Sequence, residues 1–328
     1  MPRVDPGRRQ PATQSVIATG STTEEASRPS GAPVVRFATT AIAALLLLVI
    51  VYLTFVQTEP GQRVENLGLE GAALRSDADR ADSLGQLSLV RLVPFIAVMV
   101  LVVLAASMRR RSVLGLVVVG SMAAAVVLTE LLKGLLPRPP LVEGPAWLLR
   151  NSFPSGTTAV AAAVAIAILL VSPGRLRWLA MPAAALLAAV IGQATQIAGW
   201  HRMSDGIGAV LLVVAVGAGA LTVLAAAGYV QPSSRGRISP RVRGTVTAAG
   251  AVAILLGVLV LLIGLAFPVL QAPSGAIEAF LHTSFDLVGA GATMLIVVAL
   301  GVVVEPFSLG QAADARPVVA ESSPVRPS

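Results

Sequence analysis

The chain of 328 residues has no cysteine, only two histidines and a single lysine. Without cysteine, disulfides, zinc–thiolate sites and thiol catalysis are excluded. Aromatic residues make up 4% of the chain and charged residues 12%, whereas 55% is hydrophobic and the mean hydropathy is +0.82. Because a soluble domain carries about 25% charged residues, this composition excludes an ordinary soluble globular protein.

Long apolar runs are what the chain has in abundance. A bilayer core takes about 20 apolar residues per helix, and eight runs come near that length without the polar–apolar alternation of membrane strands. The sequence therefore predicts an all-α integral membrane protein. The predicted helices are Phe37–Val56, Leu92–Ser107, Ser112–Leu132, Phe153–Ser172, Trp178–Trp200, Gly206–Tyr229, Thr245–Val269 and Leu287–Val304.

Both ends of the chain have a different composition. Residues 1–36 hold five prolines among Ser, Thr and Arg, and residues 305–328 are similar. Such segments cannot bury a core, so we expect two disordered cytoplasmic tails. The first run begins too late and is too long for a typical secretory signal, which favours an uncleaved helix.

The arginines predict the orientation. With the N-terminus inside, the internal loops Met108–Arg111, Pro173–Arg177 and Val230–Arg243 hold nine arginines and no acidic residue. The first external loop, Gln57–Arg91, has six acidic residues and four arginines. This positive-inside pattern predicts a multi-pass plasma-membrane protein with both termini in the cytoplasm. It also explains the net charge of +7 as a topology signal, which argues against a nucleic-acid partner.

Outside that first loop, the outer side has four basic residues in two short segments. Lys133, Arg138 and Arg150 lie in residues 133–151, and Arg202 lies in residues 199–205. Taken alone, such basic side chains can simply anchor the ends of helices at a membrane interface. Glu130, one helical turn before Lys133, is expected to neutralise it.

Two further patterns accompany these cations. Pro154-Ser155-Gly156 opens the fourth predicted helix, where it can serve as a helix cap or as an anion cradle at the positive end of the helix dipole. His201 precedes Asp205 by four residues, so the carboxylate can hold one ring nitrogen and leave the other nucleophilic.

Together these residues resemble the three-part signature of the phosphatidic acid phosphatase type 2 superfamily: K-x6-R-P, then P-S-G-H, then S-R-x5-H-x3-D. The resemblance covers about residues 37–229 and implies a six-helix phosphatase-like core. Residues 230–304 then add two transmembrane helices with a basic cytoplasmic loop. The implied activity is metal-independent and cofactor-free hydrolysis of a lipid phosphate or polyprenyl diphosphate at the outer membrane face.

The resemblance also implies a role for each matching residue. His201 is the expected nucleophile, which forms a phosphohistidine, and Asp205 is the partner that orients it. The remaining site residues are expected to bind phosphate: Lys133, Arg138, Ser155, Gly156, Thr157 and Arg202.

The chain departs from the family pattern at three places. The first motif is shortened, so that Pro140 stands at the position of the family's arginine, and Ala194 and Thr195 replace the Ser-Arg pair. Thr157 stands where the family has the histidine that protonates the leaving oxygen. The loss of a general acid typically lowers a rate about 10²- to 10⁴-fold.

These departures leave two hypotheses, an active phosphatase or a catalytically silent relative that binds lipid phosphates as a carrier, sensor or partner. Candidate substrates are polyprenyl diphosphate, phosphatidic acid and phosphatidylglycerol phosphate. His282, four residues before Asp286, is expected to be a solvated residue at the start of the last helix. The alternative is that it replaces the missing acid.

Overall fold

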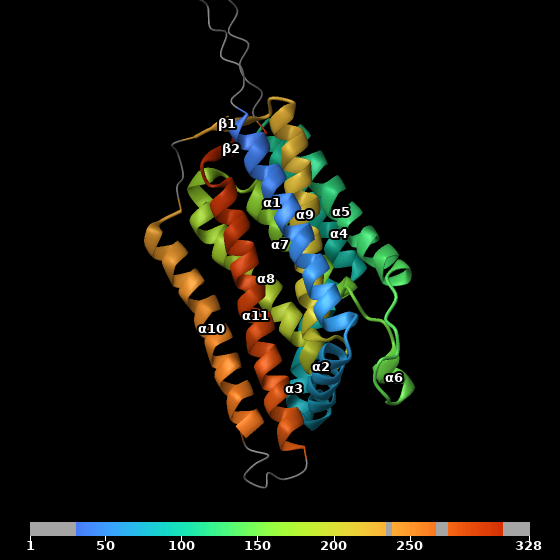
Figure 1. The fold of residues 1–328 in the computed structure, drawn as a ribbon. Helices are drawn as coiled ribbons and strands as arrows, with labels where there is room; N and C mark the ends of the chain where they lie inside the picture. Colours follow the sequence, from blue (N-terminus) through green and yellow to red (C-terminus); the bar gives the residue numbers. More distant parts are fainter. Residues whose placement is uncertain (1–30, 234–237, 267–274, 311–328) are drawn as a thin grey trace, which may run out of the picture. The chain divides into compact units, whose positions relative to one another are not determined.

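Each apolar run becomes a helix in the computed structural model, which describes residues 31–233, 238–266 and 275–310 (Figure 1). These eight helices are α1 (Ala32–Val51, continued by η1, Tyr52–Val56), α4 (Leu92–Met108), α5 (Ser112–Leu135), α7 (Gly156–Val171), α8 (Arg177–Ile197), α9 (Met203–Ala226), α10 (Pro240–Ala266) and α11 (Ala276–Val304). The all-α membrane fold is thereby confirmed.

Not every helix has membrane length by itself. Within the described residues, six helices are long and apolar enough to cross a membrane. The helix α4 passes only together with the preceding helical segment, Asp77–Val90, from which it is bent by 46°. The helix α7 is apolar but has 16 residues, because Ser155 caps its start and Ser172-Pro173 follows its end.

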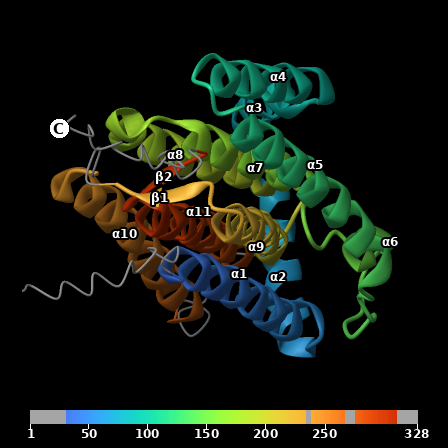
Figure 2. The ribbon, with the colours of Figure 1, turned by 90° about the horizontal axis from the view of Figure 1, so that it is seen from above.

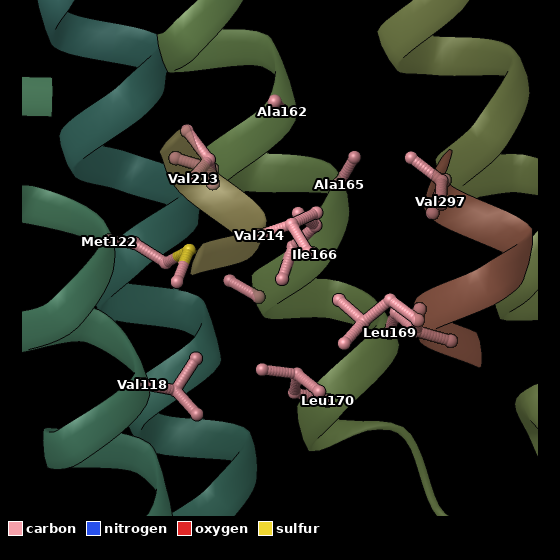
Figure 3. Packing of buried hydrophobic residues seen from close by; sticks show 14 of the residues in the cluster. Val118, Met122, Ala162, Ala165, Ile166, Leu169, Leu170, Val213, Val214 and Val297 are labelled. Carbon is pink, nitrogen blue, oxygen red and sulfur yellow. The ribbon is translucent and has the colours of Figure 1, made fainter. Parts of the chain in front are cut away.

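The helices α7 and α9 lie at the centre of the bundle. Contacts run from α4 to α7, from α7 to α9 and from α9 to α1, and Figure 2 shows the four helices in this order. Seven of the 16 residues of α7 are alanine or glycine, and such small residues let neighbouring helices approach closely in a membrane. Met122, Ile166 and Val213 from three helices belong to the resulting buried core (Figure 3).

The segment between α1 and α4, which was expected to be an external loop, is helical, and its helices were not predicted from the sequence. It contains α2 (Glu59–Gly71) and α3 (Asp77–Leu87). Thr58 and Ser76 cap these helices, since each side chain accepts a 3.1 Å hydrogen bond from the backbone N–H three residues later. Figure 1 shows α2, α3 and the short α6 (Ala146–Leu149) at the opposite end of the bundle from the two strands.

Several predicted boundaries need correction. The helix α1 begins at Ala32, within the expected N-terminal tail, and α11 begins at Ala276, eleven residues before the predicted start. The expected C-terminal tail begins with a strand, β2 (Phe307–Leu309), which pairs antiparallel with β1 (Val230–Pro232). The remaining tail residues, 1–30 and 311–328, lie outside the described residues.

A buried arginine binds both the strand β2 and the end of α11. The Arg177 guanidinium donates hydrogen bonds to the backbone carbonyls of Val304 (3.0 Å) and Phe307 (2.7 Å). These bonds satisfy carbonyls at the end of α11, where a cation is favoured by the helix dipole.

The contact between α9 and Phe153 gives a test of this packing. A Cβ on Gly208 would lie 2.5 Å from the buried Phe153 ring, whereas a Cβ on Gly219 would meet open space. We expect Gly208→Ala to destabilise the protein by about 1–3 kcal/mol and Gly219→Ala to be neutral or stabilising by up to about 1 kcal/mol. Thermal unfolding of both variants in one detergent measures this, and equal midpoints would contradict the close contact.

Candidate active site

The three motif segments meet at one end of the bundle. The Asn151 side-chain amide donates hydrogen bonds to the backbone carbonyls of Lys133 (2.9 Å) and Leu136 (2.8 Å), which joins the first segment to the second. The Ser155 N–H donates to the backbone carbonyl of Asp205 at 2.9 Å, which joins the second segment to the third. The three segments, which are separate in the sequence, therefore lie together in the folded protein.

His201 and Asp205 face each other at the start of α9. His201 Nδ1 lies 3.4 Å from Asp205 Oδ2, and the carboxylate is completely buried while the imidazole is 12% exposed. Asp205 Oδ2 also accepts hydrogen bonds from the Ser152 hydroxyl (2.6 Å) and the Arg202 N–H (2.9 Å). Because Nδ1 faces the carboxylate, Nε2 is the nitrogen that remains for a ligand.

His201 borders two open cavities. One has a volume of about 400 Å³ and the other about 260 Å³, and Lys133 lines both. The polar residues of the larger cavity are Lys133, Arg150, Asn151, Ser152, His201 and Arg202. Those of the smaller cavity are Glu130, Lys133, Thr157 and His201, together with the backbone of Gly156.

The second motif contributes backbone rather than the serine hydroxyl. Ser155 is fully buried, donates to Thr158 Oγ1 (2.9 Å) and accepts from the Thr158 N–H (3.2 Å), so that its side chain caps α7. Ser155 lines neither of the two cavities, whereas Gly156 and Thr157 line the smaller one. The first turn of α7 thus lines the smaller cavity, which is the arrangement that anion binding at a helix N-terminus requires.

The two cations of the first motif have different surroundings. Lys133 Nζ pairs with both oxygens of Glu130, at 2.9 and 3.0 Å. Both terminal nitrogens of Arg138 are buried and lack a hydrogen-bond partner among the described residues. Burial and the neighbouring Arg202 lower the pKa of Arg138, while Glu65 and Asp205 act in the opposite direction. Arg138 therefore retains free donors, although it lines neither cavity.

Arg202 is held by the protein. It is 3% exposed, and its guanidinium donates to Asn66 Oδ1 (3.0 and 2.8 Å), to the Ser152 hydroxyl (3.0 Å) and to the backbone carbonyl of Leu148. Most of its five N–H donors are thus occupied. The residue joins α2, α6 and the second motif beside the larger cavity.

One known family is similar to the part of the chain that contains this cluster. Residues 114–229 match the family described as the PAP2 superfamily. Over these residues, about a third of its length, the chain is similar to the PAP2 superfamily, and we call them the PAP2 region. It contains all three motif segments and runs from α5 through α9. No curated protein and no solved structure matches the chain.

The PAP2 region is supported by a helix outside it, which sequence reasoning missed. One face of α2 carries the buried residues Gln62, Glu65, Asn66 and Leu69. The Glu65 carboxylate accepts 2.9 Å hydrogen bonds from both the N–H and the hydroxyl of Ser204. The i, i+3, i+4, i+7 spacing of this face was the available signal, but its residues are mostly polar and a search for apolar periodicity passes over them.

A second element outside the PAP2 region corrects the expectation for His282. This histidine is 3% exposed and lies inside α11, where Nδ1 is 2.9 Å from the backbone carbonyl of Gly68 on α2. Asp286 lies 3.5 Å from its Nε2 and pairs with Arg75 at 2.7 Å. His282 is therefore not solvated, and these contacts join α11 to the core. It meets His201 only across a void of about 10 Å³, which is at the lower limit for one water molecule.

The buried Glu65 predicts a pH dependence of stability. Burial and the nearby Asp205 raise the pKa of Glu65 from 4.5 to about 7, against the opposing hydrogen bonds from Ser204 and the charge of Arg138. The folded state therefore binds this proton more tightly than the unfolded chain. The resulting stabilisation is complete below about pH 4.5 and is lost as the pH rises to about 7.

We expect this effect to reach about 3 kcal/mol, at about 1.4 kcal/mol per pKa unit. Glu65→Gln should remove it, so that the difference in unfolding temperature between variant and wild type changes across pH 4–8. A constant difference over this range would show that Glu65 does not titrate there.

Proposed function

We propose that the protein is a metal-independent membrane phosphatase that hydrolyses a lipid phosphate or polyprenyl diphosphate. The observation that supports this most strongly is the position of His201: its ring is backed by the buried Asp205 and borders two cavities that Lys133 also lines. This arrangement lies within the PAP2 region, and the similarity to the PAP2 superfamily is consistent with a phosphatase.

In the proposed reaction, Nε2 of His201 attacks phosphorus while Asp205 stabilises the positive charge that develops on the ring. The bond from phosphorus to the leaving oxygen breaks, and water later hydrolyses the phosphohistidine. Lys133, Arg150 and the amide end of α7 surround this region and can stabilise the charge on the phosphoryl oxygens without a metal.

The two remaining arginines take different parts in this proposal. Arg138 has unused, buried donors and supplies positive potential behind the phosphate site. The Arg202 side chain, which the sequence analysis assigned to phosphate binding, is committed to Asn66 and Ser152. We therefore propose that it positions the His201–Asp205 turn and contributes to the phosphate site mainly through its charge.

The surroundings of the site favour an amphiphilic substrate. Leu69, Trp147 and Trp200 line the larger cavity beside its cations, and tryptophan is enriched at membrane interfaces. The arginine-rich loops lie at the other ends of the helices that carry the site. We propose a plasma-membrane protein with cytoplasmic termini, whose site faces outward and accepts polyprenyl diphosphate, phosphatidic acid or phosphatidylglycerol phosphate.

A silent relative that only binds lipid phosphates is the second candidate. Two observations favour it: Thr157 cannot provide the family's general acid, and Lys133 is already neutralised by Glu130. Binding of orthovanadate or lipid phosphate by the purified protein, with no release of phosphate from any lipid of the candidate panel, would identify this function.

The nucleophile is tested by His201→Ala. We expect this variant to lose phosphate release from every lipid phosphate that the wild type hydrolyses, because the described residues provide no second imidazole in either cavity. The assay uses purified protein in detergent, with thermal unfolding as the control for folding. Residual turnover above about a tenth of the wild-type rate, equivalent to about 1.4 kcal/mol, would remove His201 from this role.

The cations are tested by orthovanadate binding to Lys133→Ala and Arg138→Ala. Lys133→Ala should bind about 10- to 100-fold more weakly, since a hydrogen bond to a charged group contributes about 1.5–3 kcal/mol. Arg138→Ala should bind more weakly by a smaller factor, because Arg138 lines neither cavity and acts through its charge. Arg91→Ala is the matched control, because this exposed arginine belongs to the same outer side but lines neither cavity. Unchanged binding in both test variants would reduce the first motif to a membrane anchor.

A further inference from the structure

The proposed phosphatase lacks an obvious proton donor. An alkyl phosphate needs a proton on its leaving oxygen, and Thr157 occupies the position of the family's acid. Among the described residues that line the two cavities, Glu130 is the one carboxylate, and the other groups are cations, amides, hydroxyls and the nucleophile His201 itself. The search for a donor within this site therefore leads to Glu130.

Glu130 contacts the backbone next to Thr157, the position at which the family has its histidine. A Cβ on Gly156 would be only 2.0 Å from Glu130 Oε1, so the carboxylate is in contact with the residue directly before Thr157. It also shares the smaller cavity with Thr157 and His201. A side chain from α5 thus reaches the same end of α7 from which the family's histidine projects.

The pairing of Glu130 changes when an anion enters. In the structure the carboxylate is neutralised by Lys133, which also faces both cavities. A phosphate group that engages Lys133 removes this cation from Glu130 and places a like charge beside it. The carboxyl group of Glu130 is then released from its ion pair and lies beside the bound phosphate, in the cavity that it shares with His201.

We propose that Glu130 is the general acid–base residue of this chain, in place of the histidine that Thr157 replaces. This inference rests on the proposed phosphatase function. As His201 Nε2 bonds to phosphorus, the bond between phosphorus and the leaving oxygen breaks. The electron pair stays on that oxygen, which takes the proton of Glu130. In the second step the Glu130 carboxylate accepts a proton from water, whose oxygen bonds to phosphorus and releases phosphate and His201.

Two buried groups near the site, Glu65 and His282, fit this role less well than Glu130. Both oxygens of Glu65 are occupied by Ser204, and Glu65 reaches only the void of about 10 Å³. His282 borders the same void and is hydrogen-bonded to α2. Neither lines the two larger cavities in which a substrate would be bound.

The test compares two leaving groups in wild type and Glu130→Gln. Phosphatidic acid releases an alcohol that needs a proton, whereas p-nitrophenyl phosphate releases a stabilised phenolate. Single-turnover measurements of leaving-group release isolate the first step. We expect Glu130→Gln to slow release from phosphatidic acid about 10²- to 10⁴-fold and release from p-nitrophenyl phosphate less than about tenfold. Orthovanadate should bind equally or more tightly, because glutamine releases Lys133.

Two further variants complete the experiment. Glu143→Gln is the matched control, an exposed carboxylate in the loop after α5 that should behave as wild type. Glu130→Asp keeps an acid with shorter reach and should recover part of the release from phosphatidic acid. An equal loss on both substrates, or no loss on either, would overturn the acid role while leaving the phosphatase function standing. Wild-type protein that hydrolyses neither substrate nor any candidate lipid would instead refute the function.

Discussion

The buried carboxylate of Asp205 is the group on which the arrangement of the site depends. A charge removed from water is destabilising by several kcal/mol unless hydrogen bonds and opposite charges surround it. Here Ser152, the Arg202 N–H and His201 converge on the same oxygen, Oδ2. The residue's own carbonyl accepts the Ser155 N–H. The contacts of this one residue therefore hold together the loop that contains Ser152, the loop that contains His201 and the start of α7.

The helix α2 completes this arrangement from outside the PAP2 region. Its buried polar face holds Ser204 through Glu65 and Arg202 through Asn66, while Gln62 donates to the Pro139 carbonyl at 2.7 Å. These contacts reach the first and third motifs at once. The helix α2 therefore stabilises the motif loops by hydrogen bonds, because buried polar groups in loops need hydrogen-bonding partners.

The sequence predicted the helices of the bundle, because apolar runs of membrane length have few alternatives to a helix in lipid. The gathering of Lys133, Gly156 and His201 could also be predicted, since all three were assigned to the outer ends of helices and to one family pattern. The residue-by-residue roles remain proposals that the experiments above address.

Other features depend on contacts that no local pattern reveals. The start of α11 was placed too late because Glu278, His282 and Asp286 interrupt its apolar run, yet two of these pair with each other inside the bundle. The helix α2 was missed because its buried face is polar. Ser155 matches the family motif, but whether its hydroxyl points to a ligand or caps the helix is decided by the neighbouring Thr158.

The shortness of α7 has a consequence for depth. Sixteen residues rise about 24 Å at 1.5 Å each, roughly 6 Å less than the hydrocarbon thickness of a typical bilayer. If the Ser172 end of α7 is level with one membrane interface, the amide end at Gly156 lies below the headgroups of the opposite interface. A phosphate that reaches His201 must then sink toward the acyl chains, or the membrane must thin around the protein. Local bilayer thickness would thereby control how easily a headgroup enters.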